Sequence, residues 1–296
     1  AAMNTCAAIV VMTIAVWGKM TYVKEDETPG AFTELHGIHV PIGLSIGYLI
    51  TLGFVWHFSK TYLWKVTDSK MLLERGMTIY NIFQVVFNVW MVGQFLVALT
   101  FRGHKFLGDL TVRDSGAPLG IWWHYSGKYI EFFDTYFMLI RGNMKQFTFL
   151  HVYHHCMMPL AWWCALKYCP AGDSYFGALC NSFIHVLMYL YYTLKAWKVE
   201  APWKRHLTKL QMVQFVLVFL FTAASYCITY EDIGIEVKRS YLVQAWVMLS
   251  LLVLFMQFYR NAYLEKKKRK KEKEEVPEPV EEQGSLSSES TDERRE

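Results

Sequence analysis

Residues 147–168 read FTFLHVYHHCMMPLAWWCALKY, a mostly apolar run that holds three histidines, His151, His154 and His155. About 20 apolar residues are enough for a helix to cross the hydrocarbon core of a membrane. The chain has 296 residues, of which 53% are hydrophobic and 17% aromatic, which disfavours a water-soluble domain. The stretch therefore predicts a membrane-spanning helix with ionisable rings at membrane depth, where such groups are costly and are candidates for function.

Runs of this length recur along the chain and predict an all-α polytopic membrane protein with seven transmembrane helices. Their bounds are 38–58, 79–101, 121–140, 147–168, 175–195, 209–230 and 241–263. We assign residues 38–263 to one transmembrane domain. The shorter apolar run at 6–17 has no basic residue before it, so we expect an interfacial helix or a disordered arm there.

Lysine and arginine concentrate in the first, third and fifth loops between these runs and after the last run, where residues 266–273 read KKKRKKEK. The positive-inside rule then places the C-terminal tail, 264–296, in the cytosol and the N-terminal segment, 1–37, in a lumen. We interpret the lysine run as an anchor at anionic lipid headgroups and expect no nucleic acid partner. The tail, first basic and then acidic, is predicted to be disordered.

Polar side chains form stripes at helical spacing on four of the runs. They are Lys128, Glu131 and Asp134 on the third run; the three histidines on the fourth; Asn181, His185, Tyr189 and Tyr192 on the fifth; and Thr208, Gln211 and Gln214 on the sixth. With the topology above and a rise of 1.5 Å per residue, all four stripes lie roughly 5 to 20 Å below the cytosolic surface. We expect them to converge on one buried site.

Each stripe also has a purely structural interpretation. The glutamines could be hydrogen-bonding contacts between helices, the tyrosines could belong to an interfacial belt, and Lys128 with Glu131 could be an ion pair that holds the bundle together. Three imidazoles in one turn are harder to explain structurally, because burying them in hydrocarbon is expensive. The remaining histidines, His104 and His124 among them, are interpreted as incidental.

An HxxHH box can bind a metal or handle an acyl group. Membrane di-iron desaturases and hydroxylases resemble this stretch but need about eight histidines in several boxes. This chain has one box, with His185 as the remaining deep histidine. A mononuclear metal site stays an alternative. The second use is nucleophilic and proton-transfer catalysis of acyl transfer, in which a carboxylate such as Asp134 fixes an imidazole tautomer.

Taken together, four motifs of this chain resemble those of the fatty acid elongases. These are the membrane condensing enzymes that make 3-ketoacyl-CoA from acyl-CoA and malonyl-CoA. The chain has KxxExxDT at 128–135, HxxHH at 151–155, HxxMYxYY at 185–192 and TxxQxxQ at 208–214, in the family's order. The resemblance covers about 38–263. The stretch FLHVYHH, with Tyr153 before the histidine pair, is more similar to the polyunsaturated-acyl branch.

The resemblance implies that six of the seven helices form a barrel of two inverted three-helix units around an acyl tunnel. It implies residence in the endoplasmic reticulum membrane, a metal-free site without a cofactor, and acyl-CoA and malonyl-CoA as substrates. Membrane lipid, the other enzymes of the elongation cycle and a second copy in a homodimer are the further partners that we consider.

We assign roles on this basis. His154 attacks the thioester, Asn181 and His185 stabilise the enolate formed from malonyl-CoA, and His151 and His155 position groups or carry protons. Asp134 orients the histidine pair. The residues assigned to substrate binding are Lys128, Glu131, Tyr189, Tyr192, Gln211, Gln214 and, at the cytosolic mouth for the nucleotide, Lys195, Lys204 and Arg205.

Two rival classes remain at the level of sequence: a di-iron lipid oxidoreductase, and a seven-helix receptor or transporter. The six cysteines show neither CxxC pairs nor a secreted-scaffold spacing. Cys169 and Cys227 fall near the lumenal ends of their predicted helices, so a disulfide between them is an open alternative.

Overall fold

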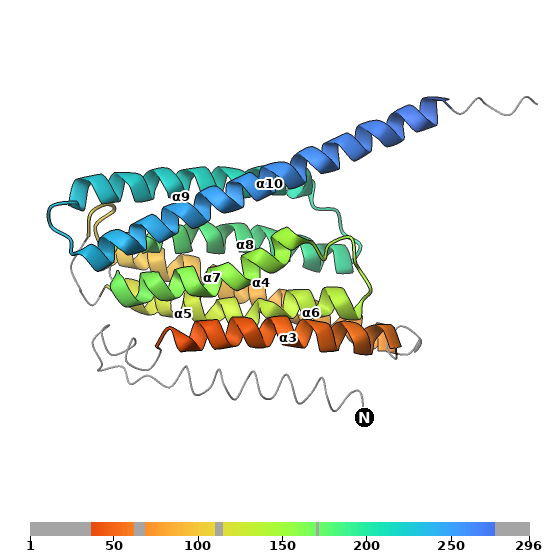
Figure 1. The fold of residues 1–296 in the computed structure, drawn as a ribbon, viewed down its shortest axis with the longest axis horizontal. Helices are drawn as coiled ribbons and strands as arrows, with labels where there is room; N and C mark the ends of the chain where they lie inside the picture. The colour runs from red at the N-terminus through yellow and green to blue at the C-terminus, as the bar shows by residue number, and fades with distance from the viewer. Residues whose placement is uncertain (1–36, 62–68, 110–114, 170–171, 276–296) are drawn as a thin grey trace, which may run out of the picture. The chain divides into compact units, whose positions relative to one another are not determined.

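The computed structural model describes residues 37–61, 69–109, 115–169 and 172–275. Within them, every predicted apolar run is helical (Figure 1). The chain divides into a unit that ends at Met256 and a second one, Gln257–Glu296, and each is described by itself. The predicted N-terminal arm at 6–17 lies outside the described residues, as does the tail from 276.

The observed helices follow the predicted runs closely and extend several of them. In chain order they are α3 (His39–Thr61), α4 (Ser69–Phe101), α5 (Ala117–Ile130), α6 (Phe132–Ile140), α7 (Phe149–Tyr168), α8 (Ser174–Ala196), the 3₁₀ helix η2 (Pro202–His206), α9 (Leu207–Thr229) and α10 (Ile235–Glu275).

Two boundaries differ from the prediction. The run 121–140 is interrupted at Glu131, where the Asp134 N–H bonds the Glu131 carbonyl three residues back, at 3.1 Å, and so tightens the turn. The part of the tail at 264–275, predicted to be disordered, is helical in α10. Lysine, arginine and glutamate are good helix formers, so a helix that has already started can continue through this segment.

Within the described residues, four segments are long and apolar enough to cross a membrane: His39–Thr61, Met71–Phe101, Pro202–Thr229 and Val237–Tyr263. They coincide with four of the seven predicted spans. The third run is divided into α5 and α6, of 14 and 9 residues, which are too short, and α7 and α8 carry polar motifs. Multi-pass membrane character is therefore supported, and the crossings predicted for the other three runs stay predictions.

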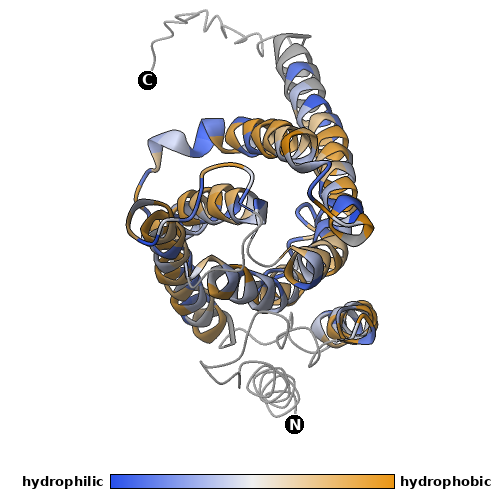
Figure 2. Cartoon of the chain, turned by 90° about the vertical axis from the view of Figure 1, so that its left-hand side faces the viewer, coloured by the Kyte–Doolittle hydropathy of each residue, from blue (hydrophilic) through white to orange (hydrophobic). Residues whose placement is uncertain are grey.

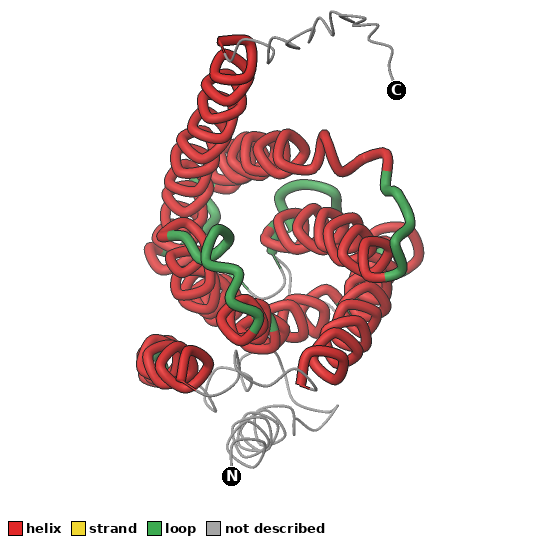
Figure 3. The backbone as a smooth tube through the Cα atoms, turned by 90° about the vertical axis from the view of Figure 1, so that its right-hand side faces the viewer, coloured by secondary structure: helices red, strands yellow, loops and turns green. Residues whose placement is uncertain are grey.

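The helices of the first unit pack side by side in a defined order, seen end-on in Figures 2 and 3. α4 packs on both α5 and α8, which also contact each other; α5 packs on α7, and α8 packs on α9. α10 contacts α7 through Tyr153 Oη, which donates to Ser250 Oγ at 2.9 Å, and contacts α9 through the rings of Phe215 and Phe255. α3 packs on α6 and α7.

Two buried carboxylates, Asp109 and Asp173, join the loop that follows α4 to the loop that precedes α8. Asp173, just before α8, accepts the backbone N–H groups of Gly108 and Asp109, at 2.8 and 3.3 Å. Asp109 in turn accepts the N–H of Lys105 and lies 3.4 Å from His104 Nδ1. Burial lowers the pKa of His104, and the nearby Asp109 and Asp173 oppose that shift. We conclude that the His104–Asp109 contact joins a neutral imidazole to a carboxylate.

No disulfide joins Cys169 to Cys227, since both are free thiols. Cys169 is buried, with its Sγ 3.8 Å from Tyr241 Oη, and burial raises the pKa of its thiol to about 11. Cys227 is exposed on α9. The disulfide alternative is therefore wrong for this structure, because the two side chains face different surroundings.

Candidate active site

Four polar side chains from α5, its junction with α6, and α8 form a closed ring of contacts. Lys128 Nζ donates to Glu131 Oε1 at 2.7 Å and to Asn181 Oδ1 at 2.8 Å. His185 Nδ1 lies 3.2 Å from Glu131 Oε1, and His185 Nε2 lies 3.4 Å from Asn181 Nδ2. All four residues are buried. Each charge therefore has an opposite or polar partner, as burial in an apolar bundle requires.

The histidine box occupies the first two turns of α7. Thr148 precedes the helix as its N-cap, and its hydroxyl accepts the backbone N–H of His151 at 3.3 Å. Pro159 lies inside the same helix and has no N–H to give to the His155 carbonyl four residues earlier. The cap fixes where the helix begins and so fixes the direction in which the three rings project.

The three histidines have different surroundings. His151 Nε2 lies 2.8 Å from Thr135 Oγ1. The buried His155 ring lies between the other two, with ring centroids 4.4 Å from His151 and 5.1 Å from His154. His154 lines a cavity. The His151 ring is thus held by a hydroxyl, the His155 ring is packed between the other two, and the His154 ring is open to the cavity.

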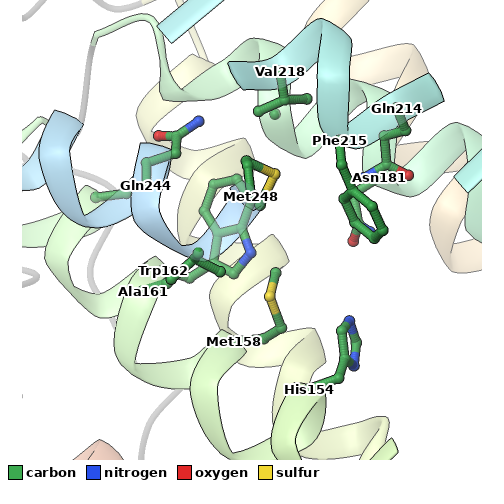
Figure 4. Close-up of a pocket in the computed structure, with 13 residues that line it drawn as sticks. His154, Met158, Ala161, Trp162, Asn181, Gln214, Phe215, Val218, Gln244 and Met248 are labelled. Atoms are coloured by element: carbon green, nitrogen blue, oxygen red, sulfur yellow. The ribbon is translucent and has the colours of Figure 1, made fainter. Parts of the chain in front are cut away.

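The cavity brings together residues from three of the predicted stripes (Figure 4). His154 and Met158 of α7 lie on one side, Gln214 and Phe215 of α9 lie across from them, and Asn181 of α8 borders the same space. The rest of the lining is mostly apolar and includes Ala161, Trp162, Ala165, Val218, Val247 and Met248. The wall near His154 therefore suits an apolar chain with a polar group at one end.

Asp134 does not take the place predicted for it beside the histidines. Its Oδ2 accepts the Tyr189 hydroxyl at 2.7 Å, and the Tyr189 ring packs edge-on against Tyr80. The hydroxyl next to His151 comes from Thr135. Since adjacent residues of a helix project about 100° apart, Asp134 and Thr135 face different neighbours. The prediction that Asp134 orients the histidine pair is therefore wrong.

The remaining predicted binding residues lie away from the cavity. Gln211 is half-buried one turn before Gln214, and the Tyr192 ring packs 6.3 Å from that of Tyr189. Lys195, Lys204 and Arg205 are exposed at the end of α8 and in η2. Lys204 Nζ lies 5.4 Å above the Tyr191 ring, and Trp203 Nε1 bonds the Leu187 carbonyl, which ties η2 to α8.

Comparison with known proteins identifies the family. The ELO (GNS1/SUR4) family model matches residues 34–271. This chain belongs to the fatty acid elongase family. It is 38% identical over 197 residues to very long chain fatty acid elongase 5 of Tachysurus fulvidraco, covering 64% of this chain and 66% of that protein, just under two thirds. It is 35% identical over 241 residues to elongase 2 of Mus musculus, with 78% and 79% coverage, and 36% identical over 230 residues to elongase 7 of Rattus norvegicus, with 72% and 79% coverage.

Several buried residues close to the site were missed in the sequence. His124, interpreted there as incidental, is buried, with Nδ1 3.2 Å from Ser182 Oγ and its ring 4.4 Å from that of Trp162. It lies four residues before Lys128, so the stripe of the third run could have been extended to it. Tyr48, whose hydroxyl lies 2.7 Å from Thr135 Oγ1, and Trp162 of the cavity wall belong to no motif, and nothing in their spacing distinguishes them.

The described part of the chain contains no group of three or more His, Cys, Asp or Glu side chains placed to share a metal ion. His154 lines the cavity, His185 faces Glu131, and His151 faces Thr135. The imidazoles thus point toward different partners. The expectation that the reaction uses no metal or other cofactor stays a prediction.

Proposed function

We propose that the chain condenses an acyl-CoA with malonyl-CoA to give a 3-ketoacyl-CoA, free CoA and carbon dioxide. The observation that carries the proposal is the position of His154, in the wall of a largely apolar cavity that Asn181 and Gln214 also border. Membership of the elongase family supplies the reaction class. The substrates are those that the family implies.

In the first half of the reaction, a ring nitrogen of His154 attacks the thioester carbon. The C–S bond breaks, CoA leaves as a thiolate that takes up the proton from the other ring nitrogen, and the acyl group stays on the neutral imidazole. Within the described residues no side chain hydrogen-bonds the His154 ring, so its lone pair is available to an acyl group in the cavity. His155 holds the ring by an edge-on contact.

In the second half, malonyl-CoA loses carbon dioxide, and the electrons of the broken C–C bond form an enolate. The enolate carbon attacks the acyl carbonyl, the C–N bond to His154 breaks, and the ring takes back the electron pair and a proton from water, which restores the neutral imidazole. Developing negative charge needs donors aimed at it. Asn181 borders the cavity and offers Nδ2 as a donor, while Lys128 holds the amide by its oxygen at 2.8 Å.

The same proposal covers the setting of the site. We place seven crossings in the endoplasmic reticulum membrane, the N-terminus in the lumen, the C-terminus in the cytosol, and six helices in a barrel of two inverted three-helix units around an acyl tunnel. The exposed Lys195, Lys204 and Arg205 would attract the CoA phosphates. Polyunsaturated acyl chains, the other enzymes of the cycle and a homodimer belong to the proposal on the family resemblance alone.

The reaction can be tested with purified full-length protein in micelles, an acyl-CoA panel and malonyl-CoA labelled at C2. We expect labelled 3-ketoacyl-CoA, with one carbon dioxide and one CoA released per product. An assay that shows no malonyl-CoA consumption would contradict the proposal, and so would about two iron atoms per chain in the active preparation.

Substitution of Gly177 by valine will shorten the longest acyl chain that is accepted. A Cβ at Gly177 would lie 3.0 Å from Gln244 Nε2 and 3.5 Å from a Trp162 ring carbon. Trp162 is two turns beyond His154 in α7, roughly 12 Å along the helix, so this end of the cavity is remote from the reacting carbon. We expect kcat/KM to fall by about 10- to 100-fold for long acyl-CoAs and by less than about threefold for short ones.

Gly43→Val is the matched control, because a Cβ at Gly43 of α3 meets nothing within 4 Å. Both substitutions place a β-branched residue in a helix, so losses from helix propensity are shared. Equal losses for long and short acyl-CoAs in Gly177→Val would show that this end of the cavity does not hold the acyl tail.

A further inference from the structure

A buried chain of hydroxyl groups connects α3 to the histidine box. Tyr48 Oη lies 2.7 Å from Thr135 Oγ1, which lies 2.8 Å from His151 Nε2. Tyr48 is 2% exposed and Thr135 is fully buried. The Tyr48 ring also stacks on Phe132 and lies beside His155, with ring centroids 4.3 and 6.3 Å away. Tyr48, which belongs to no motif, thus contacts Thr135, the residue that holds His151. It does so from α3, a helix that does not line the cavity.

The donors and acceptors along the hydrogen-bonded series Tyr48–Thr135–His151 can be assigned in one consistent direction. The Tyr48 hydroxyl is a donor that, within the described residues, has Thr135 as its partner. When Tyr48 donates to Thr135 Oγ1, the single Thr135 proton is left for His151 Nε2, which then accepts. With the opposite order, the buried Tyr48 proton has no acceptor, which is unfavourable. In the favoured order, neutral His151 carries its own proton on Nδ1.

We propose that Tyr48 is a positioning residue of the condensation reaction, which acts through Thr135 to fix the tautomer and ring orientation of His151. His151 packs on His155, and His155 packs on His154, so the orientation reaches the ring that lines the cavity. This inference rests on the proposed function for its effect on rate. Its effect on the tautomer of His151 does not depend on that function.

The same helix interface supplies a matched control. Tyr136 Oη lies 2.6 Å from Thr51 Oγ1, and Thr51 donates to the Tyr48 carbonyl at 2.8 Å. This second tyrosine–threonine pair also joins α3 to α6, but its hydroxyls lead to a backbone carbonyl. Tyr136→Phe therefore removes a comparable interhelical hydrogen bond without touching the chain to His151.

The first measurement is steady-state kinetics of Tyr48→Phe, Tyr136→Phe, Thr135→Val and Thr135→Ser in the full chain. We expect kcat to fall about 10- to 100-fold in Tyr48→Phe and Thr135→Val, with KM within about twofold of wild type. Thr135→Ser keeps the hydroxyl and should retain most of kcat, as should Tyr136→Phe. Equal losses in Tyr48→Phe and Tyr136→Phe would overturn the proposal, because the effect would then belong to helix packing.

The second measurement is independent of activity. In protein labelled with ¹⁵N-histidine, with the His151 signals assigned from a His151→Gln spectrum, we expect His151 to be the Nδ1–H tautomer. Tyr48→Phe should produce a mixture of tautomers or a protonated ring, and Tyr136→Phe should leave the signals unchanged. His151 signals unaffected by Tyr48→Phe would overturn the proposal even if the wild-type protein condenses its substrates. The expected tautomer change in a protein without condensation would contradict the proposed function alone.

Discussion

Replacement of His154 by alanine will abolish the release of CoA from an acyl-CoA in the absence of malonyl-CoA. Wild-type protein should release one CoA per active site in a burst, because the acyl group remains on the imidazole until an enolate removes it. Of the three box histidines, His154 is the one that lines the cavity. We expect the burst to disappear and elongation to fall by about a thousandfold or more. Stopped-flow detection of the free thiol measures the burst.

The control for this experiment is His57→Ala, which removes an exposed histidine from α3. That variant should give the wild-type burst amplitude. A full burst in His154→Ala would show that another residue carries the acyl group. A wild-type protein with no burst, but with normal elongation, would favour direct attack of the enolate on bound acyl-CoA. Either result would contradict the acyl-imidazole on His154.

The helices were predictable because hydrocarbon-spanning runs depend on composition alone. Residues 38–58 and α3, for example, share almost the same bounds. The stripe of Lys128 and Glu131 also came from simple geometry, since residues three apart lie on one helix face. Both side chains meet α8, through Asn181 and His185. Periodicity therefore predicted which helix faces would meet.

Periodicity could not predict which atoms would bond. Asp134 and Thr135 are neighbours in one motif, yet the carboxylate bonds Tyr189 and the hydroxyl bonds His151. Adjacent residues of a helix project about 100° apart, so the choice depends on how α6 packs against α7 and α8, which periodicity does not specify. Tyr48 was missed for another reason: its role arises from the packing of α3 on α6, a contact between segments 87 residues apart.

The second large effect concerns the Lys128–Glu131 ion pair. Substitution of either partner alone will strongly destabilise the protein. Both side chains are at most 5% exposed, and Nζ lies 2.7 Å from Oε1. Lys128→Met leaves a buried carboxylate with His185 as its remaining partner in the ring, and Glu131→Gln leaves a buried ammonium group. Breaking such a pair typically costs about 3 to 5 kcal/mol of unfolding free energy. Sodium dodecyl sulfate titration of the purified protein in mixed micelles measures that loss.

The double variant Lys128→Met/Glu131→Gln separates stability from chemistry. It buries no unpaired charge, so we expect it to regain most of the stability that either single variant loses, because the desolvation cost of both ions is removed. Its activity should stay low, since the Asn181 amide loses the ammonium group that holds it at 2.8 Å beside the cavity.

Lys167→Met is the control: it removes an exposed lysine that lies over the Trp163 ring, a contact worth about 0.5 to 1 kcal/mol. Single variants within about 1 kcal/mol of wild type would show that the pair is accessible to water. An active and stable double variant would show that the pair acts as a structural support with no part in the reaction.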